Sequence, residues 1–208
     1  MEYTPGTAHI TTDPFASICI SMLDHLNKNA AVSEVLKTLS SSLYNYDFSP
    51  LTSEGGPGTM QYKYAGLKEY ENGGGRFFSG LLLDNKYEQN AKIGAISHEL
   101  FHGYERELGQ NPATVNGEVD AYLFEYNTLM NFGGLKASLG KEGTAIGNLY
   151  QSSMWNIILG NSTNLHHDFN NAVNSFLRGS KSNINGIYNN HTISTSYQPL
   201  IFGLLPKF

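Results

Sequence analysis

Two histidines and a glutamate lie within five residues of each other and could do chemistry together. His98, Glu99 and His102 form an H-E-x-x-H motif inside a segment with helical periodicity. Residues four apart lie one turn above each other on a helix, so both imidazoles can reach one metal ion from one face. Glu99, about 100° further round the helix, can reach a water on that ion and act as its general base. The pattern indicates metal-assisted hydrolysis, with Zn2+ as the expected ion.

Two imidazoles do not complete a catalytic zinc site, so a third protein ligand is expected. Downstream of the motif, Glu118 and Asp120 lie about 160° apart on a helical wheel and cannot both face one ion. Glu118 comes sixteen residues after His102, a gap that fits a helix end, a turn and an antiparallel helix. We therefore expect Glu118 to be the ligand. Asp120 is expected either to support a ligand without touching the metal or to lie at the surface. The alternative for Glu118 is a carboxylate that merely favours a helix N-terminus.

The helix that carries the motif has one broad apolar arc, when residues are placed about 100° apart. Its members are Ile93, Ile96, Leu100, Phe101, Tyr104 and Leu108. His98 and His102 lie off this arc, so we expect them to face away from the side that packs into the core. Glu107 falls within the arc and does not fit it, but near the helix end it could bend out to solvent.

The elements that must position these residues follow from periodicity and turn signals. Helices are expected over Pro14–Asn27, Ala31–Ser40, Glu88–Leu108, Asn116–Phe132, Ala145–Leu159 and Asn164–Leu177, with Asn116 as an N-cap. Strands are expected over Thr59–Leu67 and Arg76–Asp84, joined by a turn at Asn72–Gly75. The predicted fold is α+β and mostly helical, with a small twisted antiparallel or mixed sheet packed beside the metal-binding helix. We expect one domain over residues 1–208, with residues 1–48 as an N-terminal helical segment.

The composition excludes several classes of function. The chain has 208 residues, of which 40% are hydrophobic, enough for a sizeable core. Thirteen basic against eighteen acidic residues give a net charge of -5, which argues against nucleic-acid binding. The early apolar run Phe15–Leu23 is too short to cross a membrane, and no lysine or arginine precedes it, so neither a signal peptide nor a membrane anchor is expected. Localisation stays open. Cys19, the one cysteine, excludes a cysteine-built zinc site.

The motif and the helix after it resemble the gluzincin zinc metallopeptidases, most closely their small, minimal-core members. The resemblance rests on H-E-L-F-H-G from His98 and on E-V-D-A-Y-L-F from Glu118, within residues 81–125. It implies a zincin-like fold, a zinc ion held by His98, His102 and Glu118, Glu99 as the catalytic base, and a protein or peptide substrate. Tyr122 departs from the family, which often has Asp or Asn there to supply a hydrogen bond.

A rival class, the metzincins, completes its zinc site with a third histidine in the same motif. In this chain Glu105 stands where that class needs glycine, and Leu108 stands where it needs histidine. A leucine side chain cannot bind zinc. The sequence therefore excludes the metzincins.

Two further roles stay open at the level of sequence. In gluzincins an edge strand beside the metal helix pairs with the extended substrate, and Arg76–Asp84 fits either that role or a buried core strand. Hydrolysis also needs a donor for the developing oxyanion. The side chains chemically able to supply it are Tyr150, His167, Tyr188, His191 and Tyr197.

The sequence thus predicts a zinc-dependent peptidase, which could be an effector or toxin domain of a longer protein. The alternative is a catalytically inactive zincin-like domain that binds a protein partner in its cleft. Tyr122 and the lack of an identifiable oxyanion donor favour that alternative.

Overall fold

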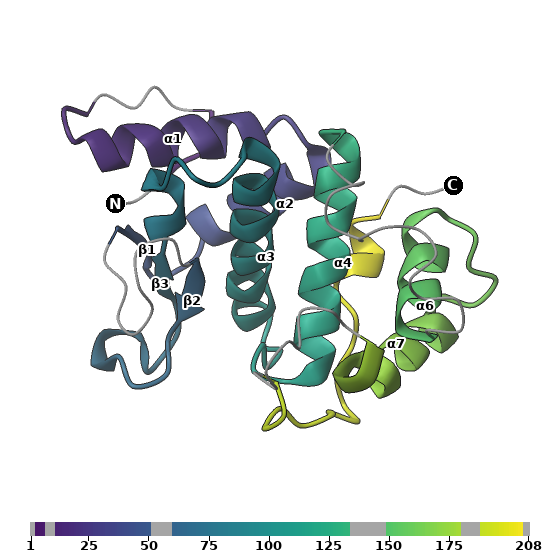
Figure 1. Ribbon diagram of the computed structural model, residues 1–208. Coiled ribbons are helices and arrows are strands. Elements are labelled where there is room, and N and C mark those ends of the chain that lie inside the picture. The colour runs from purple at the N-terminus through teal and green to yellow at the C-terminus, as the bar shows by residue number, and fades with distance from the viewer. Residues whose placement is uncertain (1–2, 7–10, 51–59, 134–148, 180–187, 206–208) are drawn as a thin grey trace. The chain divides into compact units, whose positions relative to one another are not determined.

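The computed structural model describes residues 3–6, 11–50, 60–133, 149–179 and 188–205 (Figure 1). Within these ranges the fold is α+β and mostly helical, with a three-stranded mixed sheet. This confirms the predicted α+β class, mostly helical with a small mixed sheet. By their internal contacts the residues form two compact units, Met1–Gly109 and Gln110–Phe208. In the ranges described, no helix has both the length and the apolar character needed to cross a bilayer.

The first unit begins with two helices that match the predicted ones to within a residue. Helix α1 (Pro14–Leu26) follows Asp13, and α2 (Ala30–Ser40) follows Asn29. In both cases the side chain of the preceding residue accepts a backbone N–H of the first turn, which caps the helix. The apolar faces are buried, and burial raises the pKa of the Cys19 thiol in α1 to about 12. That thiol therefore packs as a small apolar group.

The sheet of the first unit has the strand order β1-β3-β2 (Figure 1). Strand β1 (Tyr46–Ser49) is parallel to β3 (Gly75–Phe78), and β2 (Gln61–Lys63) is antiparallel to β3. The sequence did not predict β1, which is only four residues long. Its pairing with β3 is a contact between distant segments that local periodicity does not encode.

The predicted strand Arg76–Asp84 is only partly correct. The extended backbone ends at Phe78, and the rest of the apolar run forms a 3₁₀ turn, η2 (Gly80–Leu83). A short apolar run without alternation fits a strand or a buried turn equally well, and the glycine favours the break. Because β3 has a partner on both sides, the substrate-pairing edge role proposed for this segment is wrong. The core-strand alternative is confirmed, with Phe77 1% exposed.

Strand β2 is, like β1, an edge strand of this sheet, and it is shorter than the predicted strand Thr59–Leu67. Thr59 lies outside the described residues. The connection from β2 to β3 is longer than the expected turn and contains the 3₁₀ turn η1 (Lys68–Tyr70). Arg106 anchors this connection, because its Nε and Nη2 donate to the carbonyls of Gly74 (3.0 Å) and Tyr70 (2.7 Å).

The helix that carries the motif, α3, covers Gln89–Glu107 and packs against α2, β2 and β3. It ends where Gly109 adopts a φ of 78°, a left-handed conformation that glycine allows at a helix C-terminus. The sequence suggested that Glu107 could bend out to solvent, but in the structure its carboxylate has partners within the protein. Its Oε2 accepts the hydroxyls of Tyr46 (2.7 Å) and Ser42 (2.8 Å). Desolvation and the hydrogen bond to Glu107 raise the pKa of Tyr46.

The second unit contains α4 (Val115–Asn131), α6 (Leu149–Ile158), α7 (Leu165–Gly179) and the 3₁₀ turn η4 (Ile201–Gly203). Helices α6 and α7 pack against each other and against α4. The expected N-cap Asn116 is wrong, because Thr114 caps α4 by accepting the N–H of Gly117 at 3.1 Å. The start of the predicted helix from Ala145, residues 145–148, lies outside the described residues. The core side chains here include Leu123, Phe124, Met154, Phe169, Phe176 and Ile201.

Candidate metal centre

The two motif histidines share one face of α3, as their spacing predicts. Their Nε2 atoms are 3.1 Å apart, near the about 3.3 Å that two nitrogens adopt on one tetrahedral zinc at ordinary bond lengths. Both residues are 7% exposed, so the face of α3 that carries them is buried although it lies off the apolar arc. Two buried imidazole nitrogens therefore converge on one point.

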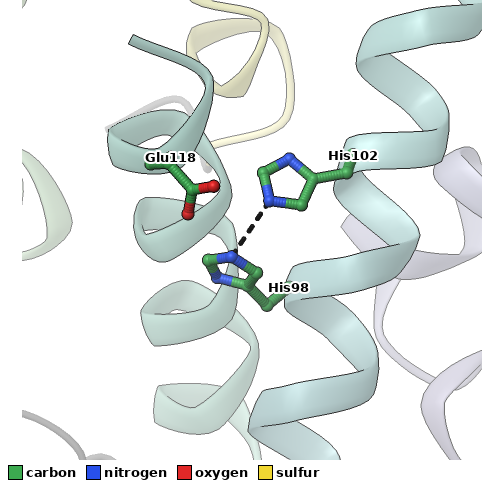
Figure 2. A group of neighbouring side chains, drawn as sticks. All are labelled: His98, His102 and Glu118. Atoms are coloured by element: carbon green, nitrogen blue, oxygen red, sulfur yellow. Dashed lines mark hydrogen bonds between the residues drawn. The ribbon is translucent and has the colours of Figure 1, made fainter. Parts of the chain in front are cut away.

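Glu118 in the first turn of α4 completes a group of three. Ligand atoms of Glu118, His98 and His102 all lie within 4.8 Å of one another. Figure 2 shows the carboxylate and the two rings turned toward a common point. Glu118 is 7% exposed, and among the described residues this is the one group of three or more potential ligands. Two nitrogens and one carboxylate oxygen, all buried, can hold a metal ion.

Glu99, the expected base, is a neighbour of this group and not a member of it. It is half-buried, and its Oε2 accepts the backbone N–H of Tyr62 at 2.6 Å. Tyr62 lies in the edge strand β2, so this N–H points away from the ladder with β3. A backbone donor on a carboxylate makes a short, charge-assisted hydrogen bond. The contact gives the Glu99 carboxylate a defined orientation.

Tyr62 is itself held firmly. Its Oη donates to the carbonyl of Gly74 at 2.8 Å, and its ring packs against Phe77 and Tyr46. Desolvation raises the pKa of its hydroxyl. The residue whose N–H orients Glu99 is therefore attached to the rest of the sheet by its own side chain.

In the second unit, His191 lies beside Glu118. Its Nε2 is 3.6 Å from Glu118 Oε1. Two contacts fix this segment on the start of α4: Val115 N–H donates to Thr192 O at 3.0 Å, and Ser194 N–H donates to Asn116 Oδ1 at 2.7 Å. The position of His191 thus follows from these two hydrogen bonds and not from its contact with Glu118 alone.

The other side chains that could stabilise an oxyanion have different surroundings in the structure. Tyr188 and Tyr122 share a hydrogen bond between their hydroxyls at 3.1 Å. Tyr197 donates to Asp120 at 2.9 Å. Tyr150 is 2% exposed, whereas His167 is exposed in the first turn of α7. Of the five residues, His191 is the one found beside the carboxylate of Glu118.

Asp120 is neither at the surface nor in the group of potential ligands. It is 0% exposed, and its carboxylate accepts hydrogen bonds from Tyr197 Oη, Leu200 N and Ile201 N. The surface expectation is wrong. Asp120 attaches the C-terminal segment to α4.

Sequence reasoning missed Glu105, treating it only as a departure from the metzincin pattern. Glu105 is 0% exposed, and its Oε2 is 2.8 Å from Nδ1 of His102. The signal was available, because residues three apart on a helix are neighbours. A carboxylate one turn after a metal-binding histidine is a natural partner for its second nitrogen.

The centre is thus built from His98 and His102 on α3 and Glu118 on α4, with Glu99, Glu105 and His191 around them. This donor set is of the kind found in catalytic zinc sites with two histidines and one glutamate. Comparison with protein-family models, with curated proteins and with solved structures finds no match to this chain.

Proposed function

We propose that the chain is a zinc-dependent peptidase with a gluzincin-like, zincin-type site. The observation that carries the proposal is the convergence of two imidazole nitrogens and one carboxylate in a buried group. Glu99 of the same motif stays outside that group and accepts the N–H of Tyr62.

Zinc suits this donor set because imidazole and carboxylate are among its usual ligands, and three protein ligands leave a position open. A zinc ion bound there would polarise a scissile carbonyl and lower the pKa of a bound water to about 7. The same two-histidine, one-carboxylate set also occurs with Fe(II). The adjacent Glu99 favours hydrolysis, since iron oxygenases need no such base.

The residues around the group then have distinct roles. Glu99 accepts a proton from the attacking water and delivers it to the leaving amine. The N–H of Tyr62, 2.6 Å from Glu99 Oε2, keeps that carboxylate in place. His191, beside Glu118, donates to the oxygen that becomes negative as the carbonyl is attacked.

The role of His191 has its own test. Removing one oxyanion donor costs about 10²–10³-fold in kcat, so we expect H191A to lose activity by that factor while zinc stays bound. H167A, which removes an exposed histidine of α7, is the matched control and keeps full activity. Equal activity in H191A and H167A would refute the assignment.

The alternative, a partner-binding domain that does not cut, has one specific observation in its favour. One carboxylate oxygen of Glu99 is already engaged by the backbone N–H of Tyr62, as in a residue that holds the strand and does not act as a base. Only an activity measurement separates the two functions.

The proposal is tested by metal content and by cleavage. After incubation with zinc and dialysis, elemental analysis should find about one zinc per chain, as for one site with three protein ligands. The loaded chain should cleave fluorescein-labelled casein, stop when 1,10-phenanthroline is added, and recover with zinc. The variant H98A should lose both zinc and cleavage. Zinc without cleavage would support the inactive alternative in a metal-holding form. A chain that holds no zinc would refute the peptidase and leave only a metal-free binding domain.

A further inference from the structure

A second carboxylate is built into the metal-binding helix. Glu105 lies on α3 three residues after His102 and is 0% exposed. Its Oε2 is 2.8 Å from His102 Nδ1, while His102 Nε2 faces His98 Nε2 at 3.1 Å. The two nitrogens of the His102 ring therefore point at different partners, a carboxylate on one side and the metal-binding point on the other.

We propose that Glu105 is a positioning residue for the metal, an inference that rests on the metal site of the proposed function. Glu105 accepts the Nδ1–H of His102, so the lone pair of this imidazole lies on Nε2. The hydrogen bond also stops the ring from turning about its side-chain bonds. A carboxylate partner makes the imidazole a more basic and stronger ligand.

The burial of Glu105 argues that this contact is more than incidental. A carboxylate taken out of water costs free energy unless it is paired. For Glu105 that partner is the ring of His102, with Glu105 Oε2 2.8 Å from His102 Nδ1. Three-residue spacing on a helix also holds the two side chains together without any long-range contact.

Charge balance points in the same direction. Glu118 and Glu105 are both buried, at 7% and 0% exposure. A dication bound between the two imidazoles would offset negative charge on these carboxylates, whereas the imidazoles carry none when neutral. The donor set thus suits a dication held by His98, His102 and Glu118 and supported by Glu105.

The test compares zinc affinity in three full-length proteins: the wild type, E105Q and the control E107Q. The dissociation constant is measured by competition with a chromogenic chelator. Glutamine keeps the size and an accepting oxygen, so it can hold the ring but lacks the charge. We expect E105Q to bind zinc about 10–100-fold more weakly. E107Q removes a carboxylate that bonds Tyr46 and Ser42 and should bind zinc as the wild type does.

An unchanged affinity in E105Q would overturn the inference, and so would an equal loss in E107Q, because that would reflect a loosened helix. Nitrogen-15 NMR of the zinc-loaded wild type tests it without any variant, which matters if E105Q fails to fold. A proton on Nδ1 of His102 with the metal on Nε2 supports the role, and the reverse arrangement overturns it. If the wild type binds zinc but cuts nothing, the peptidase proposal fails while the role of Glu105 stands.

Discussion

Replacing Glu99 with glutamine is expected to lower the rate of casein cleavage by about 10²–10⁴-fold, the usual contribution of a general base, while zinc stays bound. Zinc should stay because Glu99 is not a member of the group formed by His98, His102 and Glu118. The fold should also stay, because the amide oxygen of glutamine can still accept the N–H of Tyr62, which Glu99 accepts at 2.6 Å. What is lost is the ability to take a proton.

Initial cleavage rates and zinc content are measured on the same preparations. The matched variant E99D keeps a carboxylate but shortens its reach, so we expect it to lose less activity than E99Q. Wild-type activity in E99Q would remove Glu99 from the mechanism. Loss of zinc in E99Q would show instead that Glu99 helps to hold the metal, contrary to the role proposed for it.

The variant D120N is expected to lower the free energy of unfolding by about 2–4 kcal/mol, the cost of leaving buried partners of a charged group unsatisfied. Oδ2 of Asp120 accepts Tyr197 Oη (2.9 Å) and Leu200 N (2.7 Å), and Oδ1 accepts Ile201 N at 3.3 Å. An asparagine has one oxygen for these three donors. Whichever way its amide is turned, an NH₂ group faces a backbone N–H.

Urea denaturation followed by circular dichroism measures this loss. The control is E34Q, which removes an exposed carboxylate from α2 and should change stability by less than about 0.5 kcal/mol, as surface substitutions do. Equal stability of D120N and the wild type would mean that the C-terminal segment is not held by Asp120. A stable D120N protein that has lost zinc would instead connect Asp120 to the metal site.

The helices were largely predictable because their signals are local. Asp13 and Asn29 cap α1 and α2 through side chains that lie next to the first turn, and the periodicity of α3 lies within its own residues. The ends were less certain. Thr114 caps α4 in place of the expected Asn116. Both residue types can cap a helix, and the path of the preceding chain decides at which of them the helix begins.

The sheet was less predictable because its order depends on contacts between distant segments. The apolar run after Arg76 has no alternation, so it could be an edge strand or a central one. The parallel partner β1 lies about thirty residues earlier in the chain, and its four residues carry too little pattern to be seen. The central position of β3, and with it the edge position of β2 beside Glu99, emerges only in the folded chain.

By itself the sequence determined that His98 and His102 share a face, because a helix has 3.6 residues per turn and places residues four apart together. It also indicated Glu118 as the acid to expect beside them. The tertiary structure decided which acids lie in the interior and what each one contacts: Glu105 on His102, and Asp120 on the C-terminal segment. Burial depends on packing between residues far apart in the chain, and no local spacing encodes it.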